Sequence, residues 1–315
     1  MINTQRVAQV LGQNIGKVIV GKQDVVELLF IALICKGHVL IEDVPGVGKT
    51  SLASAMARSL DCSFKRIQFT PDVTPSDVTG YTIANFKTGE LEYRPGAVMS
   101  QIVLADEINR TSPKTQSSLL EVMEEGQTTV DGVTYAMPQP FMVLATQNPV
   151  DFVGTYPLPE AQLDRFFMKV SIGYPTADEE TDILLRYTSG ARPMEELRPI
   201  CTASDILLLQ DQLSQVHASK EVRAYISMIA AASRRHSALQ LGVSTRGAIA
   251  LLKAAQADAM LDGRDYVMPE DVQDMAPSVL AHRLVLSPEA RLRNMTAEKV
   301  LENVIASVKV PVKLP

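Results

Sequence analysis

The chain has 315 residues, 46% of them hydrophobic and 21% charged, with a formal net charge of −6 at pH 7. This length predicts about two domains, and the composition is that of an ordinary globular protein. A sequence pI near 5.4 argues against a surface that binds nucleic acid by wholesale phosphate neutralisation. The longest apolar run, residues 25–35, is shorter than the roughly 20 residues that span a bilayer. We expect no membrane insertion, and because the first residues lack a signal-peptide pattern we expect a cytoplasmic location.

Short apolar segments alternate with helical patterns through the first half of the chain. They predict an α/β fold with a five-stranded parallel sheet covered by helices on both faces. The predicted strands are residues 39–41, 64–69, 102–105, 141–146 and 168–172. The connection over residues 70–101 is rich in Pro and Gly, and a structureless loop of that length is uncommon in a compact domain. We expect it to hold an insertion with its own structure.

Only helical patterns follow Pro175. Residues 176–179 and 202–205 have the capping-box pattern that opens a helix. Helical spacing or helix-start chemistry predicts further helices, at residues 219–236, 245–261 and 269–276. The predicted organisation is an α/β domain over residues 1–174, a linker over 175–192 and a small all-α domain over 193–315.

The strongest chemical signal is a predicted strand that runs into a glycine-rich turn and then into a helix, over residues 39–51. This is the context of a phosphate-binding P-loop. Its glycines let backbone N–H groups curl around the phosphates, Lys49 bridges them, and the Thr50 hydroxyl ligates Mg²⁺. Asp43 departs from the consensus, which has its first Gly there. The motif predicts ATP and Mg²⁺ as cofactors, bound by Pro45, Gly46, Val47, Gly48, Lys49, Thr50 and Ser51.

Two acidic residues follow the predicted strand at residues 102–105. A strand that ends in Asp-Glu is commonplace, and a helix N-cap alone would explain it. Because this pair comes after a P-loop, it predicts the Walker B motif. Asp106 would hold the hydration shell of Mg²⁺, and Glu107 would orient and deprotonate the attacking water.

Three more polar residues take their predicted roles from their order in the chain. Asn148 follows the strand at 141–146, where it can hydrogen-bond the γ-phosphate or the water as sensor 1; its alternative is an Asn-Pro turn. Arg165 matches an arginine finger that acts on the ATP of a neighbouring subunit. Arg246 matches sensor 2, which acts on the ATP of its own subunit. The alternative for each arginine is a surface salt bridge.

The ordered motifs resemble the MoxR branch of the AAA+ ATPases over about residues 20–286. The most specific are Asp-Glu-Ile-Asn-Arg at 106–110 and Pro-Glu-Ala-Gln-Leu-Asp-Arg-Phe at 159–166. The resemblance implies an insertion in the second helix and a β-hairpin before sensor 1, which fits Asp131-Gly132 as a two-residue turn. It also places Val20 and Gly21 at the nucleotide and makes the all-α domain an AAA+ lid.

The same resemblance implies a hexameric ring and a chaperone-like role, in which a partner with a von Willebrand A metal-site domain is matured or activated. An ATP-driven protein remodeller is therefore the leading hypothesis. A DNA-associated AAA+ motor is the first alternative, but residues 128–135 carry no Lys or Arg to grip phosphates. An ATPase subunit similar to that of magnesium chelatase is the second. A scaffold without turnover is disfavoured by Glu107.

Overall fold

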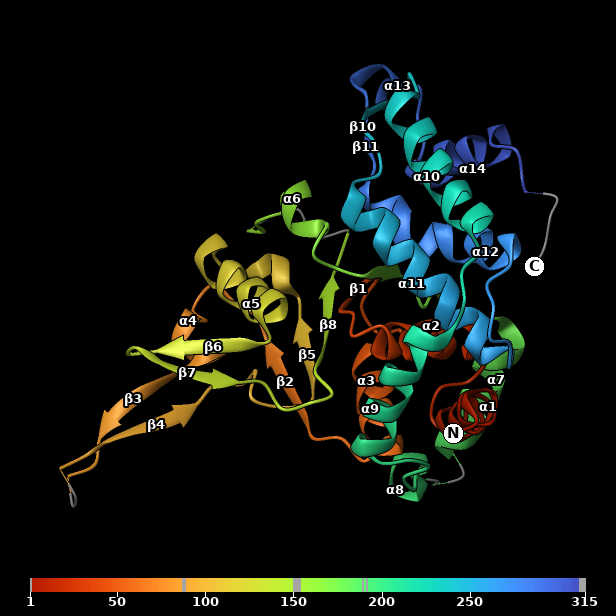
Figure 1. Cartoon of the computed structure of the whole chain (residues 1–315). Helices are drawn as coiled ribbons and strands as arrows, with labels where there is room; N and C mark the ends of the chain where they lie inside the picture. The colour runs from red at the N-terminus through yellow and green to blue at the C-terminus, as the bar shows by residue number, and fades with distance from the viewer. Residues whose placement is uncertain (1, 87–88, 150–153, 189, 191, 312–315) are drawn as a thin grey trace.

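The computed structural model describes residues 2–86, 89–149, 154–188, 190 and 192–311. Its centre is a five-stranded parallel sheet in the order β2-β5-β8-β1-β9 (Figure 1). The strands are β1 (Val39–Glu42), β2 (Phe64–Gln68), β5 (Ile102–Asp106), β8 (Met142–Gln147) and β9 (Met168–Val170). The predicted sheet is confirmed. Its inner strands β1, β5 and β8 are buried apolar runs, as strands covered on both faces require, whereas the edge strand β2 exposes most of its residues.

Helices cover both faces of the sheet. Residues at alternate positions of β1, β5 and β8 pack with α1, α2 and α3 on one face, and the intervening residues pack with α5 on the other. These helices are α1 (Thr4–Ile15), α2 (Gln23–Ile34), α3 (Lys49–Ser59) and α5 (Pro113–Glu125). No helix among the described residues has both the length and the apolar character needed to cross a bilayer.

Two β-hairpins project from the same side of the sheet (Figure 1). The first belongs to the insertion and follows α4 (Pro75–Thr79), with strands β3 (Gly80–Ala84) and β4 (Leu91–Pro95). The second pairs β6 (Gln127–Val130) with β7 (Val133–Ala136). Its turn residues Asp131 and Gly132 have φ of 48° and 81°, as a type I′ turn requires. Tyr93 and Tyr135 stack with ring centroids 3.9 Å apart and so join the two hairpins. The sequence predicts the second hairpin, and for the first it predicts only an insertion with its own structure.

The C-terminal half is mainly helical. Its elements are α7 (Ala177–Thr188), α8 (Pro193–Glu196), α9 (Ala203–Gln212), α10 (Lys220–Arg235), α11 (Thr245–Leu261), α12 (Pro269–Leu280), α13 (Pro288–Leu292) and α14 (Ala297–Ser307). The lid also carries a two-stranded ribbon, β10 (Leu239–Leu241) with β11 (Val285–Leu286). Strands of two or three residues are too short to show an alternating pattern, so the sequence does not predict this ribbon.

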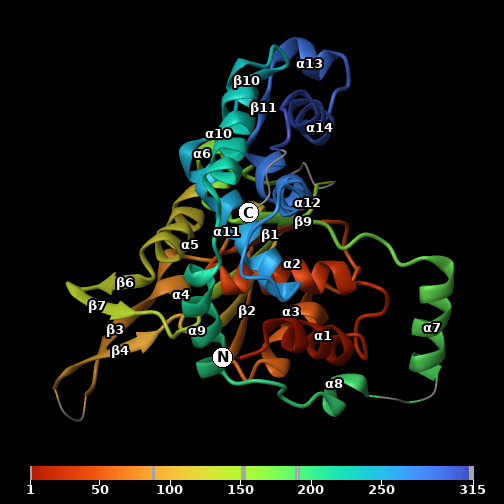
Figure 2. The same ribbon diagram turned by 45° about the vertical axis from the view of Figure 1, so that its right-hand side comes forward.

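The predicted linker holds α7, which lies at the edge of the molecule and buries none of its residues (Figure 2). Its contacts are with residues 16–21. Elsewhere one continuous apolar core joins the two halves of the molecule. It contains buried residues of α1, α2 and α3 together with buried residues of α9, α10, α11 and α12. Because this core crosses the predicted boundaries, the limits of the two domains and of the linker stay a prediction.

The lid contains a carboxyl group with an unusual proton affinity. Burial, and then repulsion from Asp271 and Asp262, raises the pKa of Asp258 to about 7. In the unfolded chain this group releases its proton near pH 4. Between about pH 4 and pH 7 the folded state holds the extra proton, so stability falls as the pH rises through this window. We expect Asp258→Asn to be more stable than the parent at pH 8 and close to it near pH 4, as measured by urea unfolding.

The exposed Asp72, changed to Asn, is the matched control. A gain of equal size from Asp72→Asn, or no gain from Asp258→Asn at pH 8, would contradict this assignment.

Candidate active site

The P-loop and the polar ends of three strands enclose a cavity of about 380 Å³. The cavity is lined by Pro45, Gly46, Gly48, Lys49, Thr50, Ser51, Arg66, Gln68, Asp106, Glu107 and Asn148. These residues meet because β1, β5 and β8 are parallel and their carboxyl ends lie at the same edge of the sheet. The structure therefore brings the predicted P-loop, the acidic pair and Asn148 together.

The P-loop has the backbone shape that phosphate binding needs. Gly46 and Gly48 have φ of 88° and 91°, a left-handed conformation that glycine adopts without strain. Gly48 also caps the start of α3 without any side-chain bond, which leaves the positive end of the helix to an anion. Burial lowers the pKa of Lys49, and the charges of nearby Asp43, Asp106 and Glu107 oppose this shift. Val47 does not line the cavity and packs against the core.

The predicted binding residues Val20 and Gly21 do not line the cavity either. They lie beside it, because the side chain of Ile19 reaches Gly48 at the start of α3. Gly21 has φ of 72°, and a Cβ there would come within 1.6 Å of the Glu179 carboxylate on α7. The positive φ favours glycine at this position, and a larger residue would also have to displace the Glu179 side chain. A contact between this segment and the nucleotide stays a prediction.

The two acidic residues are held by a hydroxyl between them. Thr146 donates its hydroxyl proton to Asp106 Oδ1 over 2.6 Å and accepts the backbone N–H of Glu107 over 2.8 Å. Arg66 Nη2 lies 2.6 Å from Asp106 Oδ2, and Gln68 Nε2 donates to Glu107 Oε2 over 2.9 Å. Glu107 itself has φ of 58°. Strained backbone of this kind in a non-glycine residue persists where its surroundings hold it, and it clusters at functional sites.

No sequence motif predicts a role for Thr146, Arg66 or Gln68. Arg66 and Gln68 are two residues apart on β2, so both side chains leave the same face of that strand. The register Gln68↔Asp106 then puts them beside the acidic pair. The spacing is visible in the sequence, but the register between two strands is not. Arg110, the last residue of the Asp-Glu-Ile-Asn-Arg motif, forms an ion pair of 3.2 Å with Glu107.

Thr50 and Asp106 fit a magnesium ion. Both line the cavity, and they offer a hydroxyl and a carboxylate, which are the hard oxygen ligands that Mg²⁺ prefers beside phosphates. Bound together with ATP, the ion would neutralise charge on the phosphate oxygens.

The two predicted arginines lie away from the cavity and meet each other at one carboxylate. Arg165 Nε lies 3.3 Å from Glu124 Oε2, and Arg246 Nη2 donates to Glu124 Oε1. The hydrogen bond from Arg246 holds the pKa of Glu124 below its usual value. The arginine side chains keep 32% and 48% of their surface exposed, so a neighbouring molecule can reach both.

This arginine pair lies at the amino edge of the sheet. Phe167, two residues after Arg165, donates its N–H to the His38 carbonyl over 2.8 Å, and His38 Nε2 lies 2.9 Å from the Met123 carbonyl. His38 immediately precedes β1, whereas the P-loop follows the other end of that strand. The expectation that Arg246 acts on the ATP of its own chain does not fit this placement. The reason is that α12 packs against β9 and brings the start of α11 to the amino edge.

The lid also fixes the segment that carries Arg165, which follows α6 (Glu160–Leu163). The buried Arg283 donates to the Asp164 carboxylate and, over 2.6 Å, to the Phe166 carbonyl. Ser244, the N-cap of α11, donates its hydroxyl to the same carboxylate over 3.3 Å. The Asp-Arg-Phe sequence therefore serves as an attachment to the lid that presents Arg165 outward.

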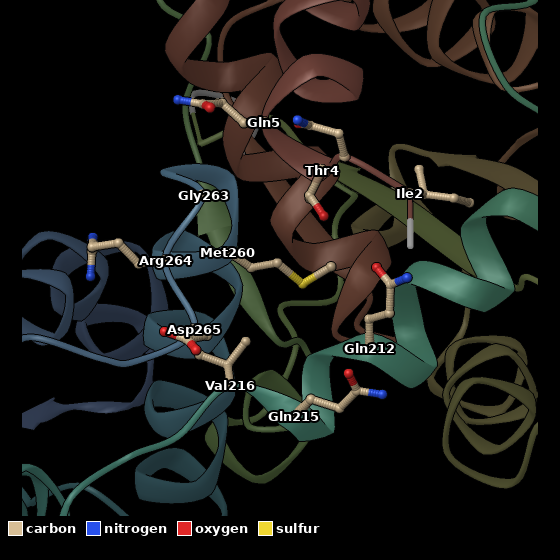
Figure 3. Close-up of a pocket in the computed structure, with 11 residues that line it drawn as sticks. Ile2, Thr4, Gln5, Gln212, Gln215, Val216, Met260, Gly263, Arg264 and Asp265 are labelled. Atoms are coloured by element: carbon tan, nitrogen blue, oxygen red, sulfur yellow. The ribbon is translucent and has the colours of Figure 1, made fainter.

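A second cavity, of about 500 Å³, lies between the start of α1 and the segments that follow α9 and α11 (Figure 3). Figure 3 shows Met260 extending between Thr4 and Gln212. The guanidinium of Arg264, at the edge of this cavity, forms an ion pair with Asp271 at 2.6 Å. None of the predicted site residues lines this cavity, so we assign the chemistry to the P-loop cavity in spite of its smaller volume.

Comparison with known proteins agrees with this site. Residues 38–168 match the family described as "ATPase family associated with various cellular activities (AAA)", and residues 231–304 match an AAA lid domain. "Uncharacterized protein YeaC" of Bacillus subtilis (strain 168) is 54% identical over 96% of this chain and 94% of its own length. "Chaperone MoxR1" of Mycobacterium tuberculosis is 40% identical over 95% of this chain and 81% of its own.

A crystal structure from Cytophaga hutchinsonii, described as that of an ATPase, superposes with a TM-score of 0.91 at 37% identity and covers 98% of this chain and 96% of its own. The agreement thus extends over both halves of the molecule, from the P-loop and the acidic pair to the lid that presents Arg165. This chain belongs to the MoxR family of AAA+ ATPases, and it hydrolyses ATP.

Proposed function

We propose that the chain works in the cytoplasm as a homohexameric ring, which uses Mg²⁺ and ATP to mature or activate a protein with a von Willebrand A domain. The observation that supports the ring is the separation of the site into two halves. Lys49, Glu107 and Asn148 line the cavity at the carboxyl edge of the sheet, whereas Arg165 and Arg246 are exposed at the amino edge. Two copies in head-to-tail contact would complete a site, and a contact of this kind forms a ring when its rotation closes.

In this arrangement each residue has a distinct task. Glu107 orients the attacking water and accepts its proton, while Asn148 hydrogen-bonds the water or the γ-phosphate. The planar, permanently charged guanidinium of Arg165 from the neighbouring copy stabilises the charge that spreads over the transferring phosphoryl oxygens. We propose that Arg246 joins it from the same neighbour, because one carboxylate holds both arginines.

The two projecting hairpins favour a protein client over DNA. In the insertion, Phe86 is fully exposed, Leu91 is 74% exposed and Tyr81 is 50% exposed. Arg94 on the same hairpin forms an ion pair with Glu92 at 3.2 Å. Exposed apolar side chains mark protein contacts, whereas a channel for single-stranded DNA needs cations that follow the phosphates.

The von Willebrand A client rests on the family resemblance and is tested by capture. A Glu107→Gln ring should retain ATP and hold its client, so a pull-down from the native cell extract should enrich one or a few von Willebrand A proteins only when ATP is present. The control is the double variant Lys49→Ala/Glu107→Gln, which should bind no ATP and capture nothing. Enrichment of nucleic acid would favour the alternative of a DNA-associated AAA+ motor. Enrichment of porphyrin-metallating subunits would favour the alternative of an ATPase subunit similar to that of magnesium chelatase.

A further inference from the structure

Asp43 occupies the position where the P-loop consensus has a glycine, and its side chain is buried. Its Oδ2 atom accepts the backbone N–H of Ile172 at 2.6 Å and of Gly173 at 2.7 Å, and the Ser171 hydroxyl at 3.1 Å. Its Oδ1 atom accepts the N–H of Val44 at 3.0 Å. A glycine could make none of these bonds. The carboxylate therefore ties the first residues of the P-loop to the turn that follows β9.

The backbone of Asp43 makes two further contacts within the site. Its N–H donates to the carbonyl of Gln147 at 3.2 Å, and Gln147 is the neighbour of Asn148. Its carbonyl accepts a proton of the Lys49 ammonium at 2.6 Å. An ammonium has three donors, so two remain for phosphate oxygens. The position of Asp43 thus determines the point from which Lys49 reaches the phosphates.

The turn held by Asp43 leads directly into α7. Gly173 in that turn has φ of 69°, and the carbonyl of Tyr174 accepts a proton from Lys22 at 3.0 Å. Further along α7, Arg186 donates to the carbonyl of Lys17 at 2.6 Å. The helix is therefore attached at both ends to residues 16–22, the segment that passes beside the P-loop.

We propose that Asp43 is a positioning residue that joins the P-loop to the turn before α7, and so sets both the reach of Lys49 and the place of residues 16–22 beside ATP. The inference rests on ATP hydrolysis at this site and does not depend on the client protein. Such positioning acts on bound ATP in the ground state and in the transition state alike. Its loss therefore raises KM and leaves kcat largely unchanged.

The test compares Asp43→Asn with the parent in ATPase assays without any client. The variant keeps the size of the side chain, but in either orientation its NH₂ group faces at least one backbone N–H donor. We expect the KM for ATP to rise about tenfold or more, with kcat within about threefold of the parent. Ser171→Ala, which removes only the 3.1 Å bond, is the matched control and should keep KM within about threefold.

Hydrogen exchange separates positioning from a merely structural role. In the parent, ATP should slow amide exchange in residues 171–188 as well as in α3. In Asp43→Asn at saturating ATP, the protection of α3 should remain and that of residues 171–188 should be lost. A parental KM, a loss of kcat without a change of KM, or a uniform increase of exchange over the whole chain would overturn the proposal.

A second variant decides the matter if Asp43→Asn does not fold. Arg186→Ala removes the side chain that donates to the carbonyls of residues 16 and 17, and so releases the far end of α7 from them. If Asp43 acts through α7, this variant should also raise KM, by about threefold, at an unchanged kcat. A parental KM in Arg186→Ala would contradict the connection through α7.

Discussion

Arg165→Ala is expected to lower ATP hydrolysis by roughly 10³–10⁵-fold, the range found for arginine fingers. This corresponds to about 4–7 kcal/mol of activation free energy. The Kd for ATP should stay within about tenfold of the parent, because the residue lies at the amino edge of the sheet and does not line the cavity of its own chain. Steady-state phosphate release and equilibrium nucleotide binding measure the two quantities.

The decisive form of this experiment mixes Arg165→Ala with Lys49→Ala. Each variant alone should be nearly inactive, but a mixed ring contains interfaces at which an intact P-loop meets an intact arginine. Hydrolysis should therefore recover on mixing and increase with protein concentration. Arg165→Ala/Lys49→Ala, with both changes in one chain, is the control and should rescue nothing when it is mixed with either single variant. No recovery in rings shown by native mass spectrometry to be mixed would place the action of Arg165 within its own chain.

Glu107→Gln is expected to lower hydrolysis by about 10²–10⁴-fold, because the amide keeps the size of the side chain but cannot take the proton of the water. ATP binding should be retained, and the ring should be easier to isolate. Lys49→Ala should differ by losing nucleotide binding as well, since the ammonium contacts the phosphates of bound ATP. Glu121→Gln, an exposed change on α5, is the matched control. Near-normal phosphate release by Glu107→Gln would remove Glu107 from the mechanism.

The sheet and the cavity could be predicted from the sequence because their signals are local. A strand such as β5 is a run of four fully buried apolar residues, and the acidic pair follows it directly. Since parallel strands end at one edge, the order of strand, P-loop, strand, acids, strand and Asn148 was enough to place these residues together. The capping boxes at Thr202 and Thr176 were visible for the same reason.

The arginine pair could not be predicted in the same way. Arg165, Arg246 and Glu124 come from three separate segments and meet only because the lid packs at the amino edge. Within one chain, each arginine forms a salt bridge, which was the alternative to its predicted role. Both arginines are nevertheless exposed, so a role for Arg165 at the site of a neighbouring copy can be tested.

Asp43 stands out in the sequence only as a departure from a consensus. Its bonds to residues 171–173 depend on the position of β9 next to β1, and no periodicity encodes that position.

The continuous core between the lid and the α/β half has a mechanical consequence. Swinging the lid on its own would expose side chains such as Leu29, Leu209 and Leu251, which are at most 1% exposed, and each one brought into water costs about 1.5–3 kcal/mol. A hinge inside one chain is therefore stiff. If the proposed ring forms, we expect each copy to turn as a single rigid unit when ATP is cleaved, so that the movement takes place at the contacts between copies.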